Sequence, residues 1–394
     1  MASLDNQMAL APKTLLDIYE RRRTTISFIE LPMLYPVNST IYTWENSHLR
    51  AFLISDLSGM DRISAGSLIK FDPLVLHVWG VDHDGMSFVK RHRALEIKQF
   101  FGEVKIDRLQ YTPAGYLPDE HVYRRRLVCR GRRYWELGDG THHLQYQREG
   151  TVQRVIVDMG QRDVLSANPD DVDIRLPPLH HNNLKPLMAV TCNPKVLAYL
   201  LSDNKYREVD VTGLHATVFQ EDPLCDLILS STNRVALESA LSIFRHPPHS
   251  TVHRSAPGPT IVLLHGGPGV GKTTTARSSA EHLRLPLLEV STGDIERQGK
   301  GSQEAFHQLL ANANRWGAVL SLEDAHMLFP DHKVDFEERH YSALLMIEAL
   351  EAHSGLLFLV TDRIGIFFEC PTHSSQYCDP TAQIRWRVSV EAFS

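Results

Sequence analysis

The sequence has few cysteines, and no two of them lie close together. Its 394 residues include five, an odd number, and none are spaced as Cys-x-x-Cys. Zinc ribbons and disulfide frameworks need closely spaced or evenly paired cysteines, so this pattern argues against both. We therefore expect free thiols in a reducing compartment at Cys129, Cys192, Cys225, Cys370 and Cys378.

Long apolar runs and a strong net charge are also missing. No apolar stretch reaches the roughly 20 residues that span a bilayer, and no apolar segment follows a basic start at the N-terminus. We expect a soluble, intracellular protein without a membrane segment, in the cytoplasm or the nucleus. The formal charge is −6, which argues against general adhesion to polyanions, so we expect no nucleic-acid partner.

The length predicts two domains, because one hydrophobic core rarely holds this many residues. We place an N-terminal domain over residues 1–200 and a second domain over residues 206–394. A stretch rich in proline and small polar residues, at about 246–259, is typical of a connector. It precedes the apolar run that begins at Thr260.

The N-terminal domain has β-like texture from about residue 63 to residue 165, which predicts a mostly antiparallel sheet. An amphipathic helix is expected before it, over residues 12–23. The predicted strands include the runs HVYRRRLVC and RRYWEL, separated by a turn at Arg130 and Gly131. The domain is thus expected to be β-rich α+β.

Arginines gather within this stretch, next to Tyr134 and Trp135. One interpretation is a basic face with aromatic stacking for nucleic acid. The other is a hairpin with a solvated basic edge, which would discourage edge pairing. The acidic overall balance favours the hairpin for Arg124, Arg125, Arg126, Arg130, Arg132 and Arg133.

The clearest motif lies in the C-terminal half. A buried-strand pattern, Thr260 to Leu264, is followed by a glycine-rich loop and a helical pattern through Leu283, which is the context a phosphate-binding GxxxxGK[ST] loop requires. Glycines let backbone N–H groups converge on phosphate oxygens, and the helix N-terminus adds positive potential. The predicted binding residues are Gly266, Gly267, Pro268, Gly269, Val270, Gly271, Lys272, Thr273 and Thr274.

Specific roles follow from the chemistry of the motif. Lys272 is expected to reach the β- and γ-phosphates, and the Thr273 hydroxyl to bind Mg²⁺. A second apolar strand ends in Glu323 and Asp324, where such proteins place the carboxylates that anchor the metal and activate water. A third apolar strand ends in residues 361–363, which gives three strand edges that one nucleotide could touch.

These motifs resemble the AAA ATPase family over residues 214–363, in HGGPGVGKTTTARSSAEHLRLPLLEVSTGDI, RWGAVLSLEDAH and GLLFLVTDR. The run RRRLVCRGRRYWELGDGTHHLQYQ resembles the uncharacterised domain that precedes such modules in fungal proteins. The resemblance implies an α/β P-loop core with a parallel sheet. It also implies ATP with Mg²⁺, a homo-oligomeric ring or a hetero-oligomer with related subunits, and a protein substrate.

The chain departs from the family pattern at four points. The family has Asp-Glu where this chain has Glu323 and Asp324, which predicts slower hydrolysis. The family's sensor is an Asn, which can donate, whereas an ionised Asp362 only accepts. After Arg363 the likeness breaks over residues 364–378, and it partly resumes over residues 379–387, where the family's arginine finger aligns with Arg385. The chain ends at Ser394, without room for the family's small helical lid, so the core is interpreted as truncated.

Three functions are compatible with this pattern. The first is an ATP hydrolase that remodels or moves a macromolecular substrate, with Asp324, Glu323, Arg385 and Asp362 in the catalytic machinery. The second is a nucleotide-dependent binding or scaffold protein that hydrolyses ATP slowly or never. A small-molecule kinase, which uses the same loop, ranks a distant third.

Overall fold

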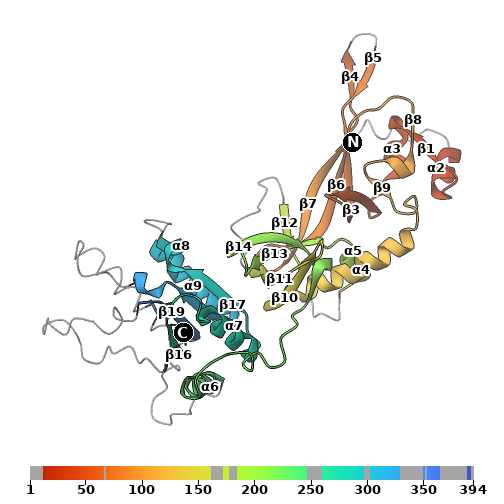
Figure 1. Cartoon of the computed structure of the whole chain (residues 1–394). Helices are drawn as coiled ribbons and strands as arrows, with labels where there is room; N and C mark the ends of the chain where they lie inside the picture. Colours follow the sequence, from red (N-terminus) through yellow and green to blue (C-terminus); the bar gives the residue numbers. More distant parts are fainter. Residues whose placement is uncertain are drawn as a thin grey trace. The chain divides into compact units, whose positions relative to one another are not determined.

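The computed structural model describes residues 12–65, 68–160, 172–176, 184–245, 260–296, 302–328, 349–350, 353–363 and 388–391 (Figure 1). The chain forms two compact units that alternate along the sequence. Unit one comprises Met1–His142, Val157–Ala198 and Arg207–Leu214, and unit two comprises His143–Ile156, Tyr199–Tyr206 and His215–Ser394. The domain boundaries near residue 200 stay a prediction, and the connector at 246–259 lies outside the described residues.

Unit one is built on a six-stranded sheet whose order is β12-β7-β6-β3-β2-β9. All of its pairings are antiparallel. Buried and half-buried residues alternate over the first six residues of β6, as expected for a sheet strand, and the last four are all buried. The strands are β2 (Thr40–Glu45), β3 (His48–Gly59), β6 (Leu74–His83), β7 (Phe88–Ile97), β9 (Thr112–Pro113) and β12 (Val172–Arg175).

The prediction that strands begin at about residue 63 is wrong, because β2 and β3 form a hairpin before it. Register pairs Glu45 with His48, so the loop has two residues, Asn46 and Ser47. Both have positive φ, 47° and 68°, as in the type I′ turn that matches the twist of a hairpin. Asn tolerates this conformation well, which explains how the turn forms without glycine.

Shorter elements surround this sheet. The predicted N-terminal helix is confirmed as α2 (Pro12–Tyr19). Residues of η1 and α3, such as Phe28 and Leu31, join Phe52 and Leu76 of the sheet in one buried cluster. The bounds are β1 (Thr25–Ser27), η1 (Phe28–Glu30), α3 (Leu31–Leu34), β4 (Arg62–Ala65), β5 (Leu68–Phe71), β8 (Glu103–Lys105) and η2 (Ile106–Arg108).

The arginine-rich run is a helix, α4 (Glu120–Glu136), so the predicted strands and basic hairpin are wrong. Its buried residues, Leu127, Gly131, Tyr134 and Trp135, recur at helical spacing, while most of its arginines lie elsewhere on its circumference. Gly131 is not a turn. It lies against α5 (Pro186–Val190), where a Cβ would come within 1.9 Å of the Ala189 carbonyl oxygen.

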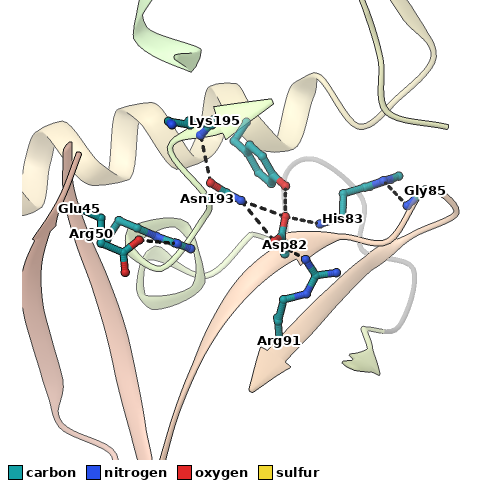
Figure 2. A network of polar contacts seen from close by, with 9 residues as sticks. Glu45, Arg50, Asp82, His83, Gly85, Arg91, Asn193 and Lys195 are labelled. Atoms are coloured by element: carbon teal, nitrogen blue, oxygen red, sulfur yellow. Dashed lines mark hydrogen bonds and ion pairs between the residues drawn. The ribbon is translucent and has the colours of Figure 1, made fainter. Parts of the chain in front are cut away.

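The buried carboxylate of Asp82 forms hydrogen bonds that link α4 and the segment after α5 to the sheet. Figure 2 shows Asp82, at the end of β6, facing Arg91 and Asn193. Its oxygens accept from Arg91 Nη1 at 2.9 Å, from the Tyr134 hydroxyl at 2.9 Å and from Asn193 Nδ2 at 3.2 Å. Asp82 is 2% exposed, and this set of donors compensates for the loss of water.

A five-stranded sheet with the order β14-β13-β11-β10-β15 contributes residues to both units. In unit two, its residues Tyr199 and Tyr206 pack on Trp316, with ring centroids 4.9 Å and 6.4 Å away. Arg154 forms an ion pair with Glu281. The strands are β10 (Thr141–Arg148), β11 (Thr151–Asp158), β13 (Lys195–Leu200), β14 (Lys205–Asp210) and β15 (Leu214–Ala216), and η5 (Val211–Gly213) precedes the last.

Unit two also contains a parallel sheet with the order β17-β18-β19-β16-β20. The predicted strands after residues 260, 318 and 355 are confirmed as three of its members. The strands of this sheet are β16 (Thr260–His265), β17 (Leu287–Ser291), β18 (Val319–Glu323), β19 (Leu356–Thr361) and β20 (Val388–Glu391). Two internal strands, β16 and β19, are almost entirely buried, as expected for a parallel sheet covered on both faces.

Helices cover both faces of this parallel sheet. Leu263 and neighbouring side chains pack with Phe306 and Leu310 of α9 (Ser302–Trp316). Val262 and Leu264 point the other way, toward α6 (Ser231–Arg245) and α7 (Lys272–Leu283). Two short elements, α8 (Thr292–Glu296) and η7 (Ala325–Leu328), follow β17 and β18.

The close approach of α4 and α5 predicts a specific cost for Gly131→Ala. The added methyl group meets backbone rather than a flexible side chain, so the helices must separate. We expect a loss of about 3 kcal/mol in the free energy of unfolding, measured by urea denaturation. Arg132→Ala, on the exposed side of the same helix, is the control and should change stability little. Equal stability of the two variants would contradict the packing.

Candidate functional site

The parallel register brings the ends of five strands to one edge of the sheet. His265, the last residue of β16, pairs with Thr361 of β19 and with Glu391 of β20. Ser291 of β17 pairs with Glu323 of β18. The chain leaves β16 through α7 and returns at the far edge as β17, so the order reverses beside β16. Such a reversal, at the carboxyl ends of parallel strands, is where ligands bind.

The loop between β16 and α7 has the backbone of a phosphate cradle. Gly269 and Gly271 have φ values of 81° and 93°, which side-chain-bearing residues rarely adopt, and Gly271 is the N-cap of α7. A Cβ built on Gly267, Gly269 or Gly271 would meet no atom within 4 Å. The space beside the loop is therefore open at the positive end of a helix of 12 residues.

Lys272 lies at the same loop. Its ammonium group donates to the carbonyl oxygens of Gly266 and Gly267, at 2.8 Å and 2.7 Å. Both hydrogen bonds lie within the glycine-rich loop, so they hold the positive charge of Lys272 beside the open space next to that loop. A phosphate oxygen that entered could take the place of either carbonyl as acceptor.

Thr273 and Glu323 meet although 50 residues separate them. The Thr273 hydroxyl donates to Oε1 of Glu323 over 3.2 Å, and the Ser321 hydroxyl lies 3.4 Å from the same oxygen. A hydroxyl and a carboxylate are oxygen ligands of the kind that Mg²⁺ prefers. This pair therefore fits the metal that normally accompanies a nucleotide.

The environment of Glu323 disfavours its charge. Burial raises the pKa of this carboxyl above its ordinary value of 4.5, and the charges of Glu289 and Asp324 raise it further. The hydrogen bonds from Thr273 and Ser321 act in the opposite direction. A cation at this position would remove the penalty, so the site favours binding of positive charge.

Asp324 occupies an unusual backbone position. Its φ is 54°, in the left-handed region, and its side chain is exposed at the edge of the sheet. The buried Thr292, at the start of α8, places its hydroxyl 3.1 Å from the Glu323 carbonyl oxygen and 2.8 Å from that of Asp324. Sequence reasoning missed Thr292, because only the pairing of β17 with β18 brings it here.

The end of β19 carries a second pair that the motifs did not indicate. His326 Nδ1 lies 3.3 Å from the hydroxyl of the buried Thr361 and 3.7 Å from Oδ1 of Asp362. Asp362, the predicted sensor, is half-exposed and therefore shares this edge with a histidine from η7. The one available signal was that His326 follows the two acids within the same turn.

Some predicted features lie outside the residues that the structure describes. Arg385 and residues 364–378 lie outside the described residues. Within the described ranges, no three His, Cys, Asp or Glu side chains gather as a metal site. No helix among those residues has the length and apolar content needed to cross a membrane.

Comparison with protein families identifies two domains in the chain. Residues 262–367 match the AAA domain, described as "ATPase family associated with various cellular activities". Residues 18–118 match a domain of unknown function, DUF7025. The chain therefore contains an AAA domain behind a β-rich N-terminal region, as the resemblance implied, and this confirms the predicted fold class of the core.

Several curated proteins are similar to part of the sequence. The mouse nuclear valosin-containing protein-like protein is 31% identical over 123 residues, which are 29% of this chain and 14% of that protein. The Drosophila melanogaster homolog of ATPase family AAA domain-containing protein 3A is 35% identical over 66 residues, 16% of this chain and 11% of that protein. Both are animal proteins, so the fungal type stays a prediction.

A solved structure of the FIGL-1 AAA domain in complex with ADP is also similar. It is 17% identical, with a TM-score of 0.33, and the match covers 45% of this chain and 57% of that chain. The chain spans only about one seventh or less of the curated relatives.

The raised pKa of Glu323 predicts a pH-dependent effect of Glu323→Gln on the nucleotide-free protein. The folded state binds this proton more tightly than the unfolded chain, so ionisation lowers stability as pH rises above about 4.5. Gln cannot ionise. The Tm of the variant, relative to the unaltered protein, should therefore increase between pH 5 and pH 8.

Thermal unfolding followed by circular dichroism measures this difference. Glu304→Gln, at an exposed position of α9, serves as the control for the loss of a carboxylate elsewhere in unit two. A Tm difference for Glu323→Gln that stays constant or decreases with pH would contradict the assignment.

Proposed function

We propose that unit two binds ATP with Mg²⁺ and hydrolyses it, as an AAA-type module that remodels or moves a macromolecular substrate. The observation that carries this proposal is the contact between Thr273 and Glu323, 3.2 Å long, beside the open glycine loop. It joins the loop that would hold phosphate to the carboxylate that would hold the metal. The AAA match over residues 262–367 supports the same conclusion.

Different residues of the site would contact the phosphates and the metal. Backbone N–H groups of residues 266–274 and the N-terminus of α7 would hold the phosphates, and Lys272 would neutralise the β- and γ-phosphates. Thr273 and Glu323 would hold Mg²⁺. When bound, that ion neutralises charge on the phosphate oxygens. The preference for ATP over GTP rests on the family resemblance alone.

Hydrolysis needs a group that orients water, and we assign this role to Asp324. Its exposed carboxylate follows the metal-binding residue directly and lies in a turn fixed by Thr292. Asp362 would lie nearby with His326 as its partner, which would offset repulsion between this carboxylate and a phosphate. Arg385 would act on the site of a neighbouring subunit, as the arginine finger does in the family.

The partners follow from the same assignment. AAA domains commonly assemble, so we propose a homo-oligomeric ring or a hetero-oligomer with related subunits. The substrate is a polypeptide or protein complex that the N-terminal domain would hold.

A second candidate is a scaffold that binds ATP but turns it over slowly or never. It is favoured by the order of the acids, Glu323 before Asp324, and by Asp362 in place of a donor amide. Both candidates need nucleotide binding, and they differ in turnover.

Variants in the loop test the proposed function directly. Lys272→Ala removes a charged contact to phosphate and should weaken ATP binding about 100-fold and abolish turnover. Thr273→Val removes the hydroxyl ligand and should weaken Mg²⁺-dependent binding about tenfold, whereas Thr273→Ser keeps the hydroxyl and should behave like the unaltered protein.

Titration of labelled ATP and steady-state phosphate release, each at several protein concentrations, give the two readouts. Turnover that rises with concentration and disappears in Lys272→Ala is expected for an assembling ATPase. Binding without turnover would instead establish the scaffold, and no binding to the unaltered protein would overturn both candidates.

The order of the acids gives a separate prediction. Glu323→Asp shortens the side chain that reaches Thr273, and Asp324→Glu puts a longer residue at a positive φ that Asp tolerates better. Restoring the family's Asp-Glu order should therefore lower kcat by about tenfold to a hundredfold rather than raise it. A gain in kcat would show instead that the native order impairs hydrolysis.

A further inference from the structure

One face of α4 is exposed and strongly basic. Val122, Arg125, Arg126, Cys129 and Arg132 are all exposed, and their spacing of three and four residues places them in one row along the helix. The opposite face packs on the sheet and on α5. The row is therefore a continuous outer surface of unit one, and we refer to it as the α4 outer face.

The charge of this face is unusual for the chain. The helix contains six arginines and two glutamates, in a protein whose formal charge is −6. Both glutamates lie at its ends, and Glu136 pairs with Arg133. In the part of the chain that the structure describes, Arg125, Arg126 and Arg132 have no acidic partner within ion-pair distance. Three guanidinium groups thus point into solvent without local compensation.

Exposed aromatic and apolar side chains lie at the first turn of α4. Trp44, at the end of β2, is 59% exposed and packs edge-on against Tyr123, with ring centroids 6.2 Å apart. Val122 is 37% exposed. Trp44 thus keeps most of its indole surface in water beside the first turn of an arginine-rich helix. Tryptophan and arginine are both enriched at the centres of protein interfaces.

We propose that the α4 outer face, together with Trp44, binds an acidic polypeptide segment that also carries apolar side chains. Arg125, Arg126 and Arg132 would pair with carboxylates along the segment, and Trp44 with Val122 would contact its apolar residues. Charge complementarity selects an acidic partner. This binding needs no nucleotide, so it stands independently of the proposed ATP site.

The surface fits a polypeptide better than single-stranded nucleic acid. Nucleic-acid grooves use several aromatic platforms for successive bases. Here Tyr134 and Trp135, the other aromatic residues of the helix after Tyr123, are 0% and 4% exposed. Val122 offers an aliphatic contact, which suits Leu or Phe of a peptide and adds little to a base.

The test uses the full chain and fluorescence anisotropy with labelled 12-residue probes. The first probe alternates Glu with Leu and Phe, the second replaces Glu by Gln, the third contains only Glu and Gly, and the fourth is a DNA strand of equal charge. The first probe should bind at least tenfold more tightly than any other, and its affinity should fall as salt rises.

Two variants assign the binding to this face. Arg125→Gln, Arg126→Gln and Arg132→Gln combined should weaken the first probe about tenfold or more, and Trp44→Ala should weaken the first probe but not the Glu–Gly probe. The matched control combines Arg22→Gln, Lys98→Gln and Arg148→Gln, exposed cations elsewhere, and should leave binding unchanged. Circular dichroism confirms that each variant is folded.

Three results would overturn the proposal. The first is equal binding of the Glu and Gln probes, and the second is an equal loss in the arginine variant and its matched control. The third is preferential binding of the DNA strand or of vesicles containing phosphatidylserine, which would assign the face to nucleic acid or to a membrane surface. None of these results depends on ATP binding or turnover.

Discussion

The hydrogen bond from Thr273 to Glu323 is the contact on which the candidate site depends. It forms because β16 and β18 end at the same edge of a parallel sheet, with β19 between them. Thr273 lies in the first turn of α7, and Glu323 is the last residue of β18. A shift of one residue in the pairing of β18 with β19 would turn Glu323 to the other face of the sheet and separate the two groups.

The surroundings of this contact hold a carboxylate in a place that disfavours its charge. Burial and two neighbouring acids oppose ionisation of Glu323, while Thr273 and Ser321 favour it. The next residue, Asp324, adopts a left-handed conformation that Thr292 supports through two carbonyl oxygens. The site is thus arranged around an expected positive charge, which explains why its acids are adjacent despite their mutual repulsion.

Sequence patterns predicted the AAA part of the fold well, because its strands are continuous apolar runs and its loop has a distinctive spacing. They failed at α4 for two reasons. The many arginines made the helical spacing of Leu127, Gly131 and Tyr134 hard to recognise. Gly131 was interpreted as a turn residue, although it lies inside the helix and allows α5 to pack closely. They also missed the hairpin at Asn46. The sequence could not indicate the roles of Thr292 and His326. Thr292 lies near Glu323 and Asp324 only because β17 pairs with β18, and His326 lies near Thr361 only because η7 follows β18.

A double-mutant cycle on Mg²⁺-dependent ATP affinity tests the central contact most directly. The four proteins are the unaltered chain, Thr273→Val, Glu323→Gln and the combination, and calorimetry with and without Mg²⁺ gives each affinity. If both side chains hold the same ion, the combined loss should be much smaller than the sum of the single losses, with coupling above about 1 kcal/mol. Additive losses, or losses that persist without Mg²⁺, would contradict the account.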